Sequence, residues 1–243
     1  MHKLVLLRHG QTIYNKQKIF CGWTDVDLTE QGIAEAESAG KNLKKAGYAF
    51  DIAFCSVLKR AIETLSIVLD EMKVTDLPIK YTWKLNERHY GDLQGKKHED
   101  VAKTCSIEQV QLWRRSFCER PPQLLESDPR NPCNDAKYCD IDKKELPCGE
   151  SLEDTVKRVL PYWKEDIMPQ IKEGKRVIVA ASGNSLRALV KYIDKISDND
   201  IVGLEIRTGT PLVYELDDDL KPLRKYYLLD NGVEEPIELF KKA

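Results

Sequence analysis

Two kinds of hydrophobic pattern, one typical of strands and the other typical of helices, alternate along this chain of 243 residues. Short apolar runs, as at 4–7 and 176–181, are typical of buried strands. Between them lie segments whose apolar residues recur every three or four positions, which is the pattern of one helix face. We therefore predict an α/β domain with strands at 4–7, 51–55, 79–83, 176–181, 212–216 and 225–228.

Capping residues mark the helices between these strands. Thr29 and Ser56 precede periodic apolar segments and are expected to cap helices there, with Gly47 ending the first. Ser151 is expected to start a long helix that Pro161 kinks or breaks. A further predicted helix spans 186–193.

The alternation of strands and helices stops between about 92 and 148. This stretch carries one amphipathic helix, 107–117, followed by a loop that is too long for an ordinary connection. We interpret it as a cap inserted over the edge of the sheet. The chain, 1–243, is thus expected to be one domain with a cap insertion and, from about 231, a mobile C-terminal tail.

Composition narrows the possible functions. The formal net charge is −2, with 38 basic and 40 acidic residues interspersed, which argues against a nucleic-acid or anionic-membrane surface. No apolar run approaches membrane-spanning length. The seven cysteines are odd in number and lack CxxC spacing, so we expect reduced thiols, a cytoplasmic location and no metal site.

Residues with catalytic chemistry gather just after the predicted strands. Because ligands of open α/β sheets bind beyond the carboxyl ends of the strands, side chains at these ends are expected to share one site. The candidates, in chain order, are Arg8 and His9 after the first strand, Arg60 after the second, Glu87 after the third and Ser182 after the fourth.

These residue types favour phosphoryl transfer. A neutral imidazole at His9 can attack with a free ring nitrogen, and a guanidinium such as Arg8 holds phosphate by paired hydrogen bonds. Asn15 could add a neutral donor, and Glu87 could move the proton of a leaving oxygen. With no metal-ligand set beside them, they predict metal-independent transfer through a phosphohistidine. Two alternatives without catalytic function remain. The stretch around Arg8 and His9 could be a core strand that ends in a surface basic residue, and the paired arginines at 114–115 could be a solvated helix end.

Seven segments between residue 4 and about 230 resemble, in order, those of cofactor-dependent phosphoglycerate mutases, a branch of the histidine phosphatase superfamily. The segments at 85–91 and 113–115 separate the mutases from simpler phosphatases. The resemblance implies a three-layer α/β/α sandwich with a mostly parallel sheet. The matching segments are Leu-Leu-Arg-His-Gly at 6–10 and those at 21–28, 56–61, 85–91, 113–115, 183–192 and 208–215.

The resemblance also implies a glycolytic and gluconeogenic isomerase that interconverts 3-phosphoglycerate and 2-phosphoglycerate. Its phosphoryl primer would be 2,3-bisphosphoglycerate, its ligands small phosphorylated three-carbon acids, and its assembly a homo-oligomer, either a dimer or a tetramer. His9 matches the phosphorylated histidine and Glu87 the proton donor and acceptor. The positions that match phosphate- or carboxylate-binding residues are Arg8, Asn15, Cys21, Gly22, Arg60, Tyr90, Arg114, Arg115, Gly183 and Asn184.

Three departures from the family pattern affect the expected catalytic rate. Ser182 stands where the family has its second catalytic histidine, and losing such a donor costs about 2.7–4 kcal/mol, or ~10²–10³ in rate, by analogy with oxyanion-hole deletions. His98 replaces the usual substrate-binding lysine, and Arg207 replaces a proline. A slowed isomerase is therefore expected. The alternatives are a catalytically impaired paralogue that binds phospho-ligands, and a bisphosphoglycerate synthase or phosphatase.

Overall fold

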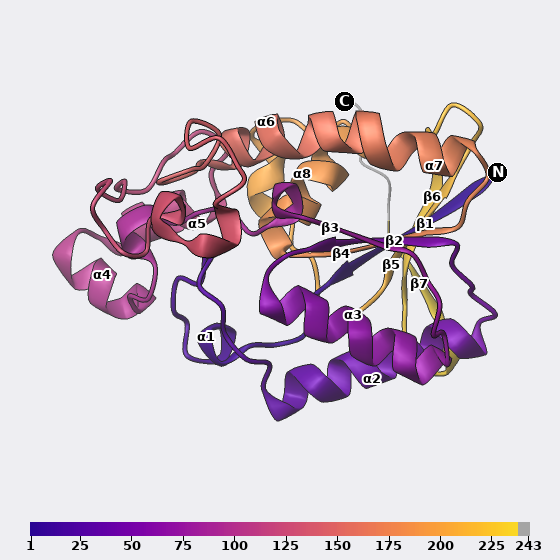
Figure 1. The fold of residues 1–243 in the computed structure, drawn as a ribbon. Coiled ribbons are helices and arrows are strands. Elements are labelled where there is room, and N and C mark those ends of the chain that lie inside the picture. Colours follow the sequence, from indigo (N-terminus) through magenta and orange to yellow (C-terminus); the bar gives the residue numbers. More distant parts are fainter. Residues whose placement is uncertain (238–243) are drawn as a thin grey trace.

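The structure, a computed structural model, describes residues 1–237 and is organised around one seven-stranded sheet (Figure 1). The strand order is β3-β2-β4-β1-β5-β6-β7. The strands are β1 (His2–Arg8), β2 (Ile52–Ser56), β3 (Ile79–Thr82), β4 (Val177–Ala181), β5 (Leu212–Leu216), β6 (Pro222–Leu228) and β7 (Glu234–Pro236).

The sheet has a parallel half and an antiparallel half. β1 to β4 pair in parallel, whereas β5, β6 and β7 each run antiparallel to the preceding neighbour in the sheet. Arg8 at the end of β1 is the register partner of Ala181 at the end of β4, and His9 N donates to Ala181 O at 3.1 Å. The residues that follow these two strands therefore emerge together at one edge.

Alternate residues of the central strands face different helix layers. Leu4 and Leu6 pack with α6 (Leu152–Tyr162), α7 (Met168–Lys172) and α8 (Gly183–Ile193). Val5 and Leu7 pack with α2 (Glu30–Lys45) and α3 (Lys59–Met72) on the other face (Figure 1). Burying both sheet faces supplies the main driving force for folding. The predicted α/β/α sandwich is confirmed, with a mixed sheet.

Most of the predicted helix starts are confirmed, but one is wrong. The Thr29 hydroxyl accepts from Gly32 N at 3.1 Å and caps α2. Ser56, in contrast, is the last residue of β2, and α3 begins at Lys59 without a side-chain cap. The Ser56 hydroxyl instead donates to Asn86 Oδ1 at 2.7 Å. A tertiary partner thus replaces the predicted cap.

Two later helices also differ in detail from the prediction. α8 starts at Gly183, three residues earlier than predicted, with Ser182 at its N-cap position. Ser151 caps α6 as expected. Beyond Pro161 the backbone stays helical and passes through one π-helical turn, Trp163–Ile167, into α7, so the helix becomes irregular after Pro161 but does not break there.

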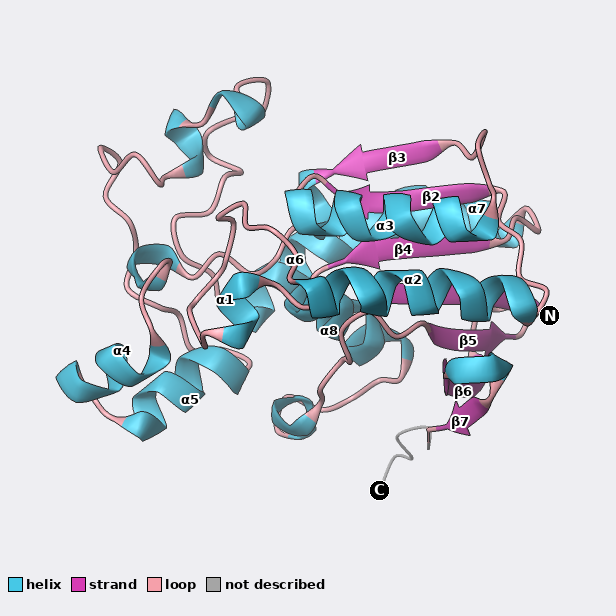
Figure 2. Ribbon diagram, turned by 90° about the horizontal axis from the view of Figure 1, so that it is seen from below, coloured by secondary structure: helices cyan, strands magenta, loops and turns pink. Residues whose placement is uncertain are grey.

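The cap region, 92–148, lies beyond one end of the sheet (Figure 2). It contains α4 (His98–Thr104), which the sequence analysis missed, and α5 (Ile107–Arg115), which is shorter than predicted. Two aromatic side chains from the segment after α1 (Ile13–Lys16) anchor it, because Phe20 and Trp23 each join a small apolar cluster that includes cap residues.

The chain after β6 departs from the expected tail. β7 pairs antiparallel with β6 and was not predicted, while residues 238–243 of that tail lie outside the described residues. Within residues 1–237, no helix is long and apolar enough to cross a membrane.

A buried ion pair fixes the segment that follows β3. Arg158 Nε donates to Glu150 Oε1 at 2.7 Å, and both side chains are more than nine-tenths buried. Arg158 Nη2 also donates to the main-chain oxygens of Asn86 and Glu87, at 3.0 and 2.9 Å. Glu150 Oε2 accepts from His89 N at 2.7 Å. One ion pair therefore sets the backbone on both sides of Glu87.

Replacing Arg158 with methionine should lower the free energy of unfolding by about 3–5 kcal/mol, because it leaves Glu150 buried without its partner. Lys157→Met is the matched control, since the Lys157 side chain is 62% exposed and pairs only at the surface. The control should cost less than about 1 kcal/mol. Urea unfolding of both variants measures the difference in the free energy of unfolding. Equal losses of stability in the two variants would contradict the role of the Glu150–Arg158 ion pair.

Candidate active site

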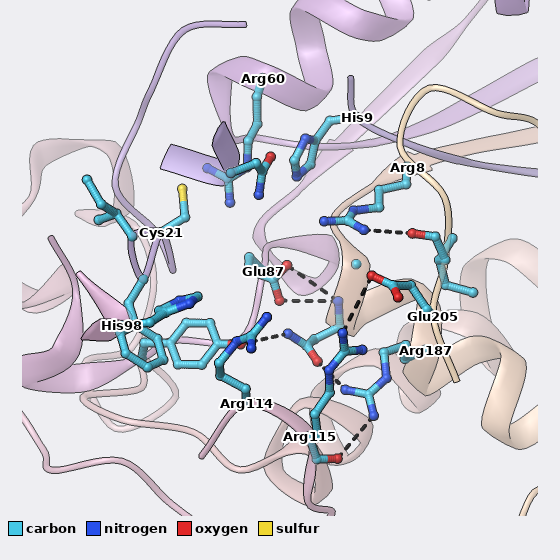
Figure 3. A pocket seen from close by; sticks show the side chains of 17 residues that line it. Arg8, His9, Cys21, Arg60, Glu87, His98, Arg114, Arg115, Arg187 and Glu205 are labelled. Carbon is cyan, nitrogen blue, oxygen red and sulfur yellow. Dashed lines mark hydrogen bonds and ion pairs between the residues drawn. The ribbon is translucent and has the colours of Figure 1, made fainter. Parts of the chain in front are cut away.

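A cavity of about 140 Å³ lies where β1 and β4 end, between the sheet and the cap (Figure 3). Its walls come from β1, α3, α5 and α8 and from the loops around them. All but two of the residues predicted for the site line it, namely Arg8, His9, Asn15, Cys21, Arg60, Glu87, Tyr90, His98, Arg114, Arg115, Gly183 and Asn184.

The two exceptions, Gly22 and Ser182, contact the Arg60 guanidinium and do not line the cavity themselves. Arg60 Nη2 donates to Gly22 O at 2.8 Å and lies 3.5 Å from Ser182 Oγ. Gly22 has a φ of +53°, and a Cβ there would come within 1.9 Å of Gln94 Oε1, so glycine is required. Ser182 is fully buried. The Ser182 hydroxyl therefore touches the cavity wall through Arg60 and is too short to line the cavity itself.

His9 is buried, and its ring is held in one orientation. Its Nδ1 lies 2.8 Å from Gly10 O and donates to it, which leaves the lone pair on Nε2. Burial, followed by the charges of Arg60 and Arg8, holds the pKa of His9 well below the usual 6.5. The imidazole is therefore neutral at pH 7 and has a nitrogen available for attack.

Positive charge dominates the walls of the cavity. Five guanidiniums against two carboxylates, with His9 neutral, leave a net formal charge of +3. Burial lowers the pKa of Arg8 from its usual value, and that of Arg187 to about 10, yet both stay protonated at pH 7. The guanidiniums belong to Arg8, Arg60, Arg114, Arg115 and Arg187, and the carboxylates to Glu87 and Glu205.

Glu87 sits at the N-terminus of α8 (Figure 3). Its Oε1 accepts from Asn184 N at 3.2 Å and from Arg88 N at 2.7 Å. Its main-chain oxygen accepts from Trp23 Nε1 at 2.5 Å and from Arg158 Nη2 at 2.9 Å. The carboxylate is thus held in the cavity wall, where it can accept or return a proton.

The cap supplies the opposite wall. Arg114 and Arg115 end α5 and face the cavity, which is not the position of a solvated helix end. The His98 ring packs against Phe20, with centroids 4.4 Å apart. Burial, and then Arg114, lowers the pKa of His98 to about 4. His98 is therefore neutral and does not supply the charge of the lysine usual at its position.

Two charged residues of the cavity were missed from the sequence. Arg187 is one turn along α8 from Gly183, so helical spacing could have revealed it. Its Nη1 donates to Asn184 Oδ1 at 2.7 Å. Glu205 lies in an irregular loop, where no periodic signal marks it. Across the described residues, no cluster of histidine, cysteine, aspartate and glutamate side chains could hold a metal ion.

Comparisons with known proteins bear on the family and on the fold of this chain. A family model described as histidine phosphatase superfamily (branch 1) matches residues 4–228. The structure is similar to a mycobacterial glucosyl-3-phosphoglycerate phosphatase in complex with VO3, with a TM-score of 0.69, 22% identity, and 96% of this chain and 100% of that chain covered.

Two other solved structures are similar to the same extent. Bacillus stearothermophilus YhfR gives a TM-score of 0.68 at 21% identity, covering 95% of this chain and 97% of its own. An alpha-ribazole phosphatase from Shigella flexneri gives 0.64 at 21% identity, covering 97% and 99%. At these identities the likeness concerns the fold.

The neutral state of His9 can be measured by NMR titration of its ring, assigned with a His9→Gln variant. The His9 signal should show no midpoint near pH 6.5 and should stay that of a neutral ring well below this pH. Arg60→Gln should raise the pKa towards 6.5, because one opposing charge is removed. Arg120→Gln, at an exposed ion pair, should leave it unchanged. A His9 midpoint at or above 6.5 would contradict the assignment.

Proposed function

Since the chain belongs to branch 1 of the histidine phosphatase superfamily, we propose that it interconverts 3-phosphoglycerate and 2-phosphoglycerate through a phosphohistidine on His9. Phosphoryl transfer of the histidine phosphatase type follows from the family. The proposal that the substrates are phosphoglycerates rests on one observation: a neutral His9 imidazole lies in a compact cavity of net charge +3, with Glu87 in the cavity wall.

The size and charge of the cavity favour a small acid with one phosphate. A phosphate carries about −1.5 to −2 charges, so a phosphorylated three-carbon acid carries about −2.5 to −3. This nearly balances the +3 of the cavity walls. The volume of about 140 Å³ lies below the roughly 300–1,000 Å³ usual for drug-sized ligands, which favours a compact one.

In the proposed reaction, His9 Nε2 attacks a phosphorus atom of 2,3-bisphosphoglycerate. An N–P bond forms, the P–O bond to the glycerate oxygen breaks, and Glu87, which must be protonated for this step, gives this oxygen its proton. In the reverse step the hydroxyl of a bound phosphoglycerate attacks the phosphohistidine and returns its proton to Glu87. Return of the phosphoryl group to the other oxygen completes the interconversion. The arginines neutralise the phosphoryl charge throughout.

A phosphatase is the second candidate. Two of the three similar solved structures carry phosphatase names, and one of those names contains 3-phosphoglycerate as part of the substrate. Water would then discharge the phosphohistidine. A paralogue that only binds ligand would form no phosphohistidine at all.

Incubation with 2,3-bisphosphoglycerate should place acid-labile phosphate on His9, because this imidazole is neutral and its Nε2 is free. Peptide mapping under alkaline conditions locates it. His98→Gln removes the other histidine of the cavity and should still be phosphorylated, whereas His9→Gln should not.

Product analysis on the same preparation then separates the candidate reactions. Conversion of 3-phosphoglycerate to 2-phosphoglycerate in excess of phosphate release supports the mutase. Phosphate release alone would make the protein a phosphatase. The absence of phosphate on His9 would contradict both.

Two substitutions at Ser182 test why the reaction should be slow. Ser182→Ala should change kcat by no more than about threefold, since the hydroxyl makes only a long contact of 3.5 Å with Arg60. Ser182→His should raise kcat by ~10²–10³ with little change in KM, the pattern of a donor used in the transition state. Steady-state kinetics, with melting temperatures as a folding check, decide the point. Equal turnover of a folded Ser182→His variant would contradict this account.

A further inference from the structure

Glu205 introduces a negative charge into a cavity built to bind anions. It lies in the loop between the 3₁₀ turn Asp200–Gly203 and β5, and it lines both the active cavity and the outer groove beside it. Figure 3 shows its carboxylate facing the cavity from the side of Arg8 and Arg115. A carboxylate at this place competes with a bound anion for the same guanidiniums.

The Glu205 carboxylate is held less firmly than the backbone next to it. Glu205 Oε1 lies 3.5 Å from Arg115 Nη2, and the Glu205 side chain is 68% exposed. The following residue, Ile206, accepts a short hydrogen bond of 2.6 Å from Arg8 Nη1. Arg207 next to it forms a two-bonded pair with Glu235, at 2.7 and 2.8 Å. The backbone that follows Glu205 is therefore fixed, while the carboxylate can leave Arg115 at little cost.

The charge of Glu205 reaches more than one of the binding arginines. It raises the pKa of Arg8 and of Arg114 against the larger lowering by burial, in addition to its contact with Arg115. Without Glu205 the cavity would carry a net charge of +4 in place of +3. With Glu205 present, the +3 of the cavity walls nearly balances an acid with one phosphate, whose charge is about −2.5 to −3. An acid with two phosphates carries about −4 to −5 charges, and the cavity does not balance it.

We propose that Glu205 is a specificity-determining residue that selects ligands by charge, holding Arg115 when the cavity is empty and disfavouring a second phosphate relative to one. The repulsion acts mainly on the outer part of the ligand, because Glu205 lies on the side where the cavity meets the groove. We expect this repulsion to lower the affinity for a ligand with two phosphates by about tenfold relative to a ligand with one. This role rests on the proposed function only for the identity of the natural ligands.

Calorimetry on a His9→Ala protein, which binds without reacting, tests the proposal. Adding Glu205→Gln keeps the shape and removes the charge. It should tighten 2,3-bisphosphoglycerate about tenfold and 3-phosphoglycerate by no more than about threefold, and the difference should shrink at high salt. Asp219→Asn is the control, since it removes one negative charge from an exposed side chain that lines neither the cavity nor the groove, and it should leave the ratio unchanged. An equal change for both ligands, or none, would overturn the proposal.

Inorganic phosphate and pyrophosphate, measured on the same variants, separate this proposal from the choice of substrate. If neither 3-phosphoglycerate nor 2,3-bisphosphoglycerate binds, the proposed function is wrong. The role of Glu205 is then tested by the affinities for phosphate and pyrophosphate. Glu205→Gln should then favour pyrophosphate over phosphate by about tenfold relative to the parent protein. An unchanged ratio would overturn the role of Glu205 regardless of the natural substrate.

Discussion

The pairing of buried arginines with main-chain oxygens is the interaction on which the site depends. Arg8 donates to Ile206 O, Arg60 to the oxygens of Gly22 and Thr24, and Arg187 to Ile201 O. A buried guanidinium needs such partners because desolvation is costly. Carbonyl oxygens satisfy the hydrogen bonds without cancelling the charge, so most of the positive charge remains for a phosphoryl group. The Nε atoms of these three arginines have no partner among the described residues.

This arrangement explains why irregular segments surround a regular sheet. Strands and helices use their own carbonyl groups internally, so only loops and helix ends can present oxygens to the arginines. The loop that holds Arg60 needs the positive φ of Gly22, and the loop that holds Arg8 is fixed by the pair of Arg207 with Glu235. The Glu150–Arg158 ion pair does the same for the segment that carries Glu87. The cap closes the remaining side.

The sequence reveals the parts that local chemistry determines. Apolar periodicity located the layers, and strand ends located His9 and Glu87, because burial and sheet topology leave a clear local pattern. Ser56 was misassigned because its hydroxyl bonds to Asn86, thirty positions away, a choice that no local pattern encodes. β7 was missed since a three-residue edge strand depends on pairing with β6. Ser182 was expected in the cavity, yet it contacts the Arg60 guanidinium without lining the cavity. Glu205 stands alone in a loop, and only the folded structure places it among the arginines.

The central claim is that fixed guanidinium charge, and not a charged histidine, binds the phosphoryl group beside a neutral His9. The dissociation constant of inorganic phosphate, measured by calorimetry between pH 5.5 and 8 at constant ionic strength, tests this claim most directly. Affinity should rise with pH as phosphate gains its second charge and should then level off, because the charge of the cavity does not change in this range. Affinity that falls as pH rises through 6.5 would mean that a protonated imidazole supplies the binding charge, and it would contradict the account.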